Sequence, residues 1–244
     1  MPSRLPVDTT IMTMRMATIT ESGLYKLMTW LSPAYPLGAF SYSHGIEYAV
    51  EAGLVRDAAG LRDYVASAVT AGAGRSDAAL FAAAWRAVVD TDAARFDAIA
   101  DRGAAWRGSA ETALESAAQG AAFLATTRAA WPHPTLDALA LRRNHAVVLP
   151  VAVAAACAAH GIALAPALAA YLHAFAANLI SAGVRLIPLG QTEGQGAIAA
   201  LEPVIAATVT RAQTTPLEET GTSAPLLDWC SMRHETQYTR LFRS

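Results

Sequence analysis

The chain has 244 residues, with 18 Lys and Arg against 20 Asp and Glu, so its formal net charge is −2. A chain with almost no net charge lacks the strongly basic surface that binds nucleic acid or an anionic membrane. We therefore predict neither as a partner. Hydrophobic residues make up 54% and charged residues 16% of a chain rich in alanine, which suits one helical domain with a large core.

The first 21 residues lack the continuous apolar core of a secretory signal, and we predict that they form a flexible arm. A short amphipathic helix is expected from Ser22 to Leu31, because Leu24, Leu27 and Met28 recur at three- and four-residue spacing.

Residues 32–47, SPAYPLGAFSYSHGIE, interrupt the helical pattern. Two prolines and Gly38 predict a stiff turn. Ser41 or Ser43 is expected to cap a helix that runs through Glu47, which leaves Phe40, Tyr42 and His44 exposed where that helix begins. A plain connector is the alternative, but loops on a rigid scaffold often carry binding groups.

The chain from Asp57 to about residue 130 predicts four helices. Asp57 caps the first, and Ser76 or Asp77 and then Thr91 are expected to open the next two. In the fourth, over residues 109–128, Leu114 and three alanines (117, 118 and 121) share a predicted apolar face.

After the break WPHP at 131–134, Thr135 is expected to cap a short helix. The run from Ala146 to Ala159 is the longest apolar stretch, but it is shorter than the roughly 20 residues that cross a bilayer. We predict a buried helix kinked at Pro150, and a soluble, cytoplasmic protein. Cys157 and Cys230 are too few for a disulfide framework and fit a reducing compartment.

Pro166 fits the first turn of a long helix with an apolar stripe through Leu172 and Leu179. A second polar junction, RLIPLGQTEGQG at 185–196, precedes a helix of about 15 residues. Residues 213–225 are rich in Thr, Ser, Glu, Gly and Pro and predict a linker. We therefore predict an all-α fold: one helical domain over 22–212, roughly eight to ten helices, and a flexible C-terminal tail over 226–244.

No stretch carries the pattern of a catalytic or cofactor site. GQTEGQG at 190–196 lacks the Gly-Lys-Ser/Thr ending of a phosphate loop, and Lys26 is the one lysine of the chain. The six histidines are scattered, without an HExxH or CxxC motif, and no G-x-S-x-G elbow occurs. We predict no nucleotide site, no catalytic nucleophile, no cofactor and no tight metal site.

The tail MRHETQYTRLFRS, 232–244, mixes cations, hydroxyls and apolar groups. It is too polar to fold alone, so it is either an ordinary disordered end or a segment that orders on a partner. In the second case Tyr238, Leu241 and Phe242 would anchor it, while Arg240 and Arg243 would meet carboxylates.

Three stretches together resemble the urease accessory protein UreF family: residues 32–55, residues 185–195 and the C-terminal 232–244. The resemblance implies an all-α homodimer without catalytic activity, which bridges the accessory protein UreD (UreH in some bacteria) and the GTPase UreG. It further implies docking of this complex on apo-urease, where GTP hydrolysis by UreG is coupled to nickel insertion, and a role in regulating that hydrolysis.

The resemblance also implies partner-binding residues in each stretch. Those of the first stretch belong to a platform for UreG, the second stretch lies near it, and the tail orders on UreD. His44 and Tyr35 receive no special role. The implied residues are Tyr42, Ser43, Gly45, Glu47, Arg185, Gln191, Glu193, Arg233, His234, Glu235, Tyr238, Arg240, Leu241 and Phe242.

Two other classes stay open from the sequence. One is a metallochaperone that carries nickel on His44, His234 or other histidines. The other is a helical enzyme with an unrecognised pocket, which is disfavoured because no paired carboxylates or metal motif occur at helical spacing.

Overall fold

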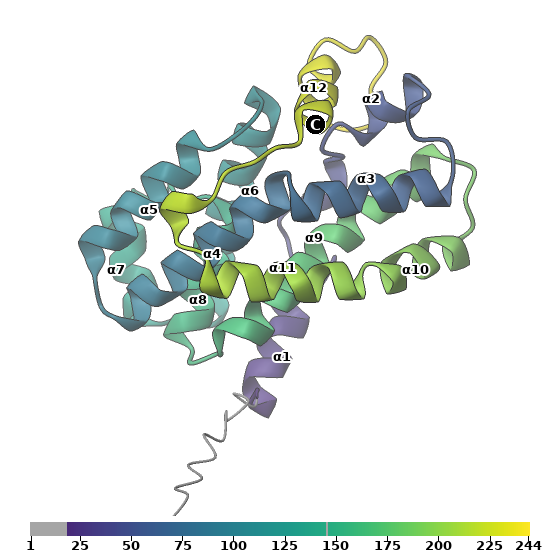
Figure 1. Ribbon diagram of the computed structural model, residues 1–244. Coiled ribbons are helices and arrows are strands. Elements are labelled where there is room, and N and C mark those ends of the chain that lie inside the picture. Colours follow the sequence, from purple (N-terminus) through teal and green to yellow (C-terminus); the bar gives the residue numbers. More distant parts are fainter. Residues whose placement is uncertain (1–18, 145) are drawn as a thin grey trace, which may run out of the picture.

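A computed structural model describes residues 19–144 and 146–244. The described residues hold twelve α-helices and two short 3₁₀ turns, at Ala39–Ser41 and Leu217–Glu219, and no strand (Figure 1). The helices are α1 (Glu21–Trp30), α2 (Ile46–Glu51), α3 (Ala58–Thr70), α4 (Ala73–Val89), α5 (Ala93–Ala105), α6 (Ala110–Ala130), α7 (Pro134–Arg142), α8 (Leu149–Ala159), α9 (Leu164–Leu186), α10 (Gln191–Ala200), α11 (Glu202–Thr214) and α12 (Pro225–His234).

The predicted all-α fold is confirmed. Two helices were not expected separately: the helix predicted after residue 196 is divided into α10 and α11 at Leu201, and the segment predicted as a tail begins with α12. The predicted arm, residues 1–21, lies outside the described residues except for its last three, of which Glu21 begins α1.

The centre of the core is α8, which packs between α4 and α6. Every residue from Pro150 to Cys157 is buried, as the continuous apolar run predicts. The predicted kink is wrong, because Pro150 lies in the first turn of α8, where its missing N–H costs no helical hydrogen bond.

Helix α9 carries the predicted stripe, with Leu168, Leu172 and Leu179 fully buried. It is long and apolar enough to cross a bilayer by length and composition, but half of its most apolar window is buried in the protein. It packs against α2, α3, α4, α10 and α11, so its apolar character belongs to the core of the domain.

The register predicted for α6 is wrong. Leu114 is 65% exposed, and the alanines predicted to share its face are exposed or half-buried. The buried face instead carries Glu115, Gln119 and Phe123 at four-residue spacing. A prediction from hydrophobicity places the apolar residues of α6 on its buried face. In the structure, polar side chains that have buried hydrogen-bond partners lie on that face instead.

Several helix starts also differ from prediction. Asp57 caps α3 as expected, accepting from the Gly60 N–H. Ser76 and Asp77 lie inside α4 and are buried, because α4 begins at Ala73. The caps of α5 and α7 are Asp92 in place of Thr91 and His133 in place of Thr135.

Gly120 of α6 makes the closest approach to the segment before α8. A Cβ there would lie 1.9 Å from the Val147 carbonyl oxygen, whereas one on Gly196 of α10 would meet no atom within 4 Å. We expect Gly120→Ala to lower the free energy of unfolding by about 1–3 kcal/mol through overpacking. Gly196→Ala, the matched control, should be neutral or stabilising by up to about 1 kcal/mol, because alanine favours helix. Urea unfolding followed by circular dichroism measures both, and equal losses would contradict this packing.

Candidate partner-binding site

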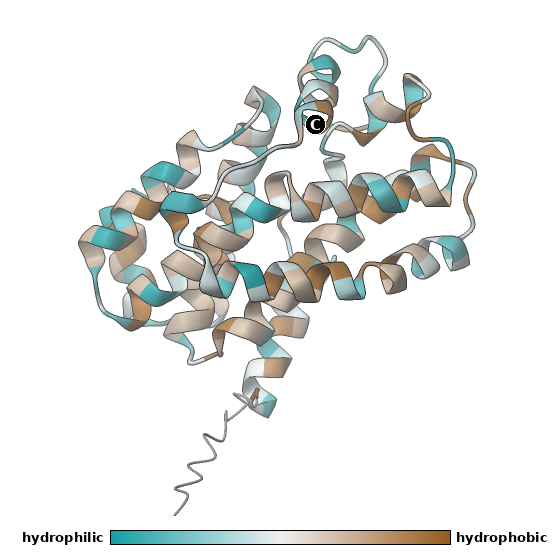
Figure 2. Ribbon diagram, in the orientation of Figure 1, coloured by the Kyte–Doolittle hydropathy of each residue, from teal (hydrophilic) through white to brown (hydrophobic). Residues whose placement is uncertain are grey.

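The C-terminal residues lie against the 32–47 loop, α2 and α6 (Figure 1). Helix α12 packs on α2 and α6, and the chain after it turns back so that Phe242 and Ser244 are buried. Figure 2 shows the turn after α12 as mainly hydrophilic, in contrast with the apolar core helices. Polar contacts therefore account for much of its attachment.

Glu47, on α2, is the main acceptor for the tail. Its Oε1 accepts from the Leu241 N–H (2.6 Å), and its Oε2 accepts from the Phe242 N–H (2.9 Å) and from His234 Nε2 (3.0 Å). The carboxylate is 7% exposed, so these three donors replace the water that it would otherwise bind. Such charge-assisted bonds are stronger than neutral ones.

His234 links α12 to two other helices. Its side chain is fully buried, and its Nδ1 lies 2.7 Å from Glu111 Oε2 on α6. Both ring nitrogens of His234 therefore lie within hydrogen-bond distance of a carboxyl group, one on α6 and one on α2. Arg240 completes the cluster, because its Nη1 donates to Glu111 Oε1 at 2.6 Å.

Ser43 holds the end of the tail. Its N–H donates to the Ser244 carbonyl oxygen at 2.6 Å, and its hydroxyl donates to the same oxygen. Beside it, the Arg243 N–H donates to the Ser41 carbonyl at 2.7 Å. The predicted cap position is wrong, because α2 begins at Ile46 and its N-cap is Gly45, although the Ser43 hydroxyl also accepts from the Glu47 N–H in the first turn, at 3.5 Å.

Gly45 is required by its position. Its φ is +76°, in the region that residues with a Cβ rarely adopt. A Cβ there would also lie 2.6 Å from the Ser231 amide nitrogen and 2.8 Å from the Cys230 carbonyl carbon, both in α12. The loop and α12 are thus in backbone-to-backbone contact.

The loop is covered more than predicted. Phe40 is exposed as expected, but Tyr42 is only 5% exposed and the Arg243 guanidinium lies 6.0 Å from its ring centre. His44 is also mostly buried, and its Nε2 lies 2.9 Å from Glu115 Oε1. The prediction that Tyr42 and His44 are displayed is wrong, because the tail and α6 cover them.

The His44–Glu115 pair connects the loop to the inward face of α6. Burial lowers the pKa of His44, but the charge of Glu115 and the hydrogen bond to it outweigh that effect, so the pKa lies above its ordinary value. Asp77 raises it further and Arg107 lowers it. Glu115 also accepts from the Gln119 amide and from the Ser244 hydroxyl at 3.0 Å, so the same carboxylate contacts the tail.

Arg185 joins the second junction to this site. Its Nη2 donates to the Phe40 carbonyl at 2.9 Å, and its guanidinium stacks 4.4 Å from the centre of the Phe242 ring. Burial lowers the pKa of Arg185, although its ordinary value is so high that it stays charged. One side chain thus touches both the loop and the tail.

The other two residues of the second junction are not part of this cluster. Gln191 and Glu193 are exposed, and no hydrogen bond or ion pair links either to the loop or the tail among the described residues. Glu193 accepts from the Gly190 N–H at 2.8 Å and so caps α10.

The remaining predicted residues lie on the outside of the tail. Glu235 accepts from the Ala110 N–H at 2.9 Å, at the start of α6, and the Arg233 guanidinium lies 5.7 Å from the Tyr48 ring. Tyr238 is fully exposed and Leu241 is 65% exposed, so only Phe242 of the three predicted anchors is buried in the protein itself.

Sequence reasoning missed Glu111 and Glu115 and gave His44 no role. The signal available was the spacing of Glu111, Glu115 and Gln119, which places three polar side chains on one face of a helix. That face is ordinarily solvated, so only the position of the tail identifies it as part of a site.

The described residues contain no group of three or more His, Cys, Asp and Glu side chains placed to hold a metal ion. Burial raises the pKa of both thiols, that of Cys230 to about 11, so both stay protonated and are poor metal ligands at neutral pH.

Fold and site together define an all-helical protein whose C-terminal segment is docked by buried ionic contacts. The UreF family model matches residues 55–202. The urease accessory protein UreF of Granulibacter bethesdensis is 54% identical over 92% of this chain and 95% of its own. Those of Bradyrhizobium sp. BTAi1 and Rhodopseudomonas palustris TIE-1 are each 51% identical, over 94% and 92% of this chain and 95% and 93% of their own. The chain belongs to the UreF family of urease accessory proteins.

The His44–Glu115 pair gives a pH dependence of known sign. Because the pKa of His44 is raised on folding, its contribution to stability is complete below about pH 6.5 and is lost as pH rises through the higher folded value. We expect the free energy of unfolding to fall above pH 6.5 more steeply in the unmodified protein than in His44→Gln. His173→Gln, at an exposed histidine of α9, serves as control and should follow the unmodified protein. Urea titrations between pH 6 and 9 test this, and a His44→Gln curve parallel to the unmodified one contradicts it.

Proposed function

We propose that this protein is a non-catalytic urease maturation factor of the cytoplasm. It bridges UreD (UreH) and the GTPase UreG as a homodimer, and the assembled complex supports GTP-dependent nickel insertion into apo-urease. The proposal rests on membership of the UreF family and on the resemblance of three stretches of the chain to it.

The observation that carries the proposal is the two-sided character of the C-terminal segment. Its inward groups are held by Glu47, Glu111 and Glu115. Its outward side presents Tyr238, 104% exposed, and Leu241, 65% exposed, with Trp229 at 44%. A segment that is fixed from within and exposes three large apolar or aromatic side chains among polar ones is suited to contact a second protein.

In this proposal UreD binds the outer side of α12 and the tail, and UreG binds the adjacent loop. The ordering of the tail on UreD stays a prediction. In terms of the buried contacts, we expect UreD to bind the tail in its docked position and so to favour that position. The docked tail then supports Tyr42 and Ser43 of the proposed UreG platform, and it contacts Arg185 of the second junction beside that platform.

Gly45→Ala tests the docking step. Alanine at residue 45 collides with the backbone of α12, so the docked position should be lost and this protein should no longer co-purify with UreD and UreG. Gly38→Ala is the matched control: Gly38 also has a positive φ (+71°), but its Cβ would meet nothing within 4 Å. Both variants carry backbone strain of about 1–2 kcal/mol, so only the collision distinguishes them.

Retention of UreD and UreG is measured by affinity purification from cells that express all three proteins. Circular dichroism confirms that the helical body of both variants is folded. If Gly45→Ala recovers UreD and UreG as well as Gly38→Ala does, the docked segment is not what the partners require.

Arg185 raises the question whether it acts directly on GTP. In some GTPase systems an arginine supplied by a partner accelerates hydrolysis. Here the guanidinium is already engaged by Phe40 and Phe242, which favours a positioning role. We expect Arg185→Ala to weaken assembly but to leave the single-turnover rate of GTP hydrolysis by UreG unchanged in complexes that do form. A loss of rate of about 10³-fold or more in intact complexes identifies an arginine finger instead.

A further inference from the structure

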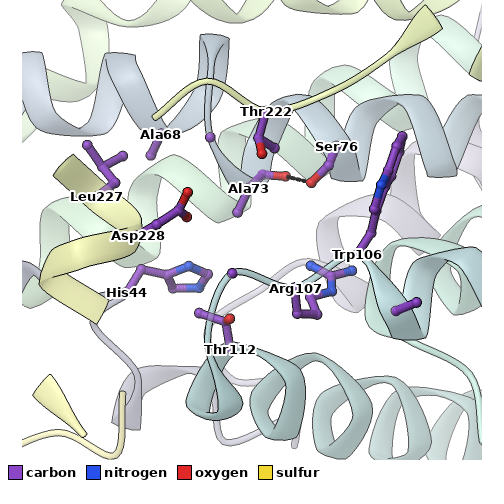
Figure 3. Close-up of a pocket in the computed structure, with 13 residues that line it drawn as sticks. His44, Ala68, Ala73, Ser76, Trp106, Arg107, Thr112, Thr222, Leu227 and Asp228 are labelled. Carbon is purple, nitrogen blue, oxygen red and sulfur yellow. Dashed lines mark hydrogen bonds between the residues drawn. The ribbon is translucent and has the colours of Figure 1, made fainter. Parts of the chain in front are cut away.

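A cavity of about 200 Å³ lies beside α12 and shares one lining residue, His44, with the loop contacts described above (Figure 3). Its walls come from the 32–47 loop, α3, α4, the end of α5, the start of α6 and the connection between them, the linker and α12. Pockets for drug-sized ligands and cofactors usually measure about 300–1,000 Å³, so this one suits a smaller molecule.

Arg107 provides the cationic wall. Its side chain is only 6% exposed; Nη1 donates to Asp77 Oδ1 at 2.8 Å and Nε donates to the Gly103 carbonyl at 3.2 Å. Its Nη2 is buried and has no hydrogen-bond partner among the described residues. A buried guanidinium N–H without an acceptor is costly, and Figure 3 shows the guanidinium at the edge of the cavity.

Asp228 provides the opposite wall, from α12. Its carboxylate is half-buried and accepts no hydrogen bond among the described residues, and burial raises its pKa. Figure 3 shows Asp228, His44 and Thr112 directed toward the same space as Arg107. The cavity therefore offers an unused donor on one side and an unused acceptor on the other.

We propose that this cavity binds a small oxyanion that still carries a hydroxyl group, such as hydrogen phosphate or bicarbonate. Its charged oxygens accept from Arg107 Nη2, and its hydroxyl donates to Asp228. A fully deprotonated oxyanion lacks that donor and would place negative charge against the Asp228 carboxylate.

The charges around the cavity are compatible with such a ligand. Arg107 and His44 line it, and each is paired on its far side with a carboxylate, Asp77 and Glu115. Asp228 is the only acidic side chain among the lining residues. The ligand would bridge α12 to the α5–α6 connection and so stabilise the position of α12.

The test is calorimetric titration of the full-length protein with phosphate, bicarbonate and sulfate at constant ionic strength and near-neutral pH. Sulfate is the matched ligand without a proton to donate. We expect saturable binding of phosphate, bicarbonate or both, at least about tenfold tighter than sulfate, because a buried charged group left without its hydrogen bond is penalised by about that factor. Comparison of phosphate with bicarbonate identifies the preferred ligand.

Two substitutions place the binding in this cavity. Asp228→Asn supplies an amide donor in place of the carboxylate and should remove the preference over sulfate. Ala105 lines the cavity, so Ala105→Leu adds side-chain volume to its wall and should abolish binding, while Ala104→Leu, an exposed neighbour outside the lining, should not. Circular dichroism verifies the fold of each variant. Phosphate should also slow amide hydrogen exchange in α12 of the unmodified protein.

Absence of saturable binding by phosphate and bicarbonate overturns the proposal. So does binding that Ala105→Leu leaves unchanged in a folded protein, or an Asp228→Asn variant that keeps the full preference over sulfate.

Discussion

The carboxylate of Glu47 is the constraint on which the arrangement of loop, α2 and tail depends. It is almost fully buried, and its hydrogen bonds come from two backbone amides of the tail and from His234. A buried charge deprived of its partners costs about 3–5 kcal/mol. When the tail is displaced, the Glu47 carboxylate of α2 must therefore become exposed to water, or other hydrogen-bond donors must take the place of those of the tail. The helical body and the tail are thus coupled even though they are separate in the sequence.

Helix positions follow from the sequence where burial is apolar. The stripe of α9 and the continuous apolar run of α8 identify core helices because hydrophobic burial decides their orientation. The orientation of α6 does not follow, since Glu115 and Gln119 take the inside and Leu114 the outside. A prediction from hydrophobic periodicity cannot account for a hydrogen-bond acceptor whose donor lies more than a hundred residues away in the sequence.

The same limit applies to the site. The loop and the tail are each recognisable as unusual, and the resemblance to the UreF family names residues in both. That they bind each other depends on pairs such as Glu47 with Leu241, 194 residues apart. Local rules do not reach such pairs. Glu193 shows a second limit of local rules: its carboxylate accepts from the Gly190 N–H at the start of α10, and its predicted contact with a partner stays a prediction.

Because the tail has a buried side and an exposed side, a substitution that disturbs its docked position can be distinguished from one that disturbs only its exposed surface. Changes at Phe242 or His234 act through the docked position, because these side chains are buried in the protein's own body. Changes at Tyr238 or Leu241 leave those contacts in place, because their side chains point to solvent. Arg240 is intermediate: it is partly exposed, yet it is paired with Glu111. A loss of partner binding at an outward residue therefore reports on the interface itself, whereas the same loss at an inward residue reports on whether the interface is formed.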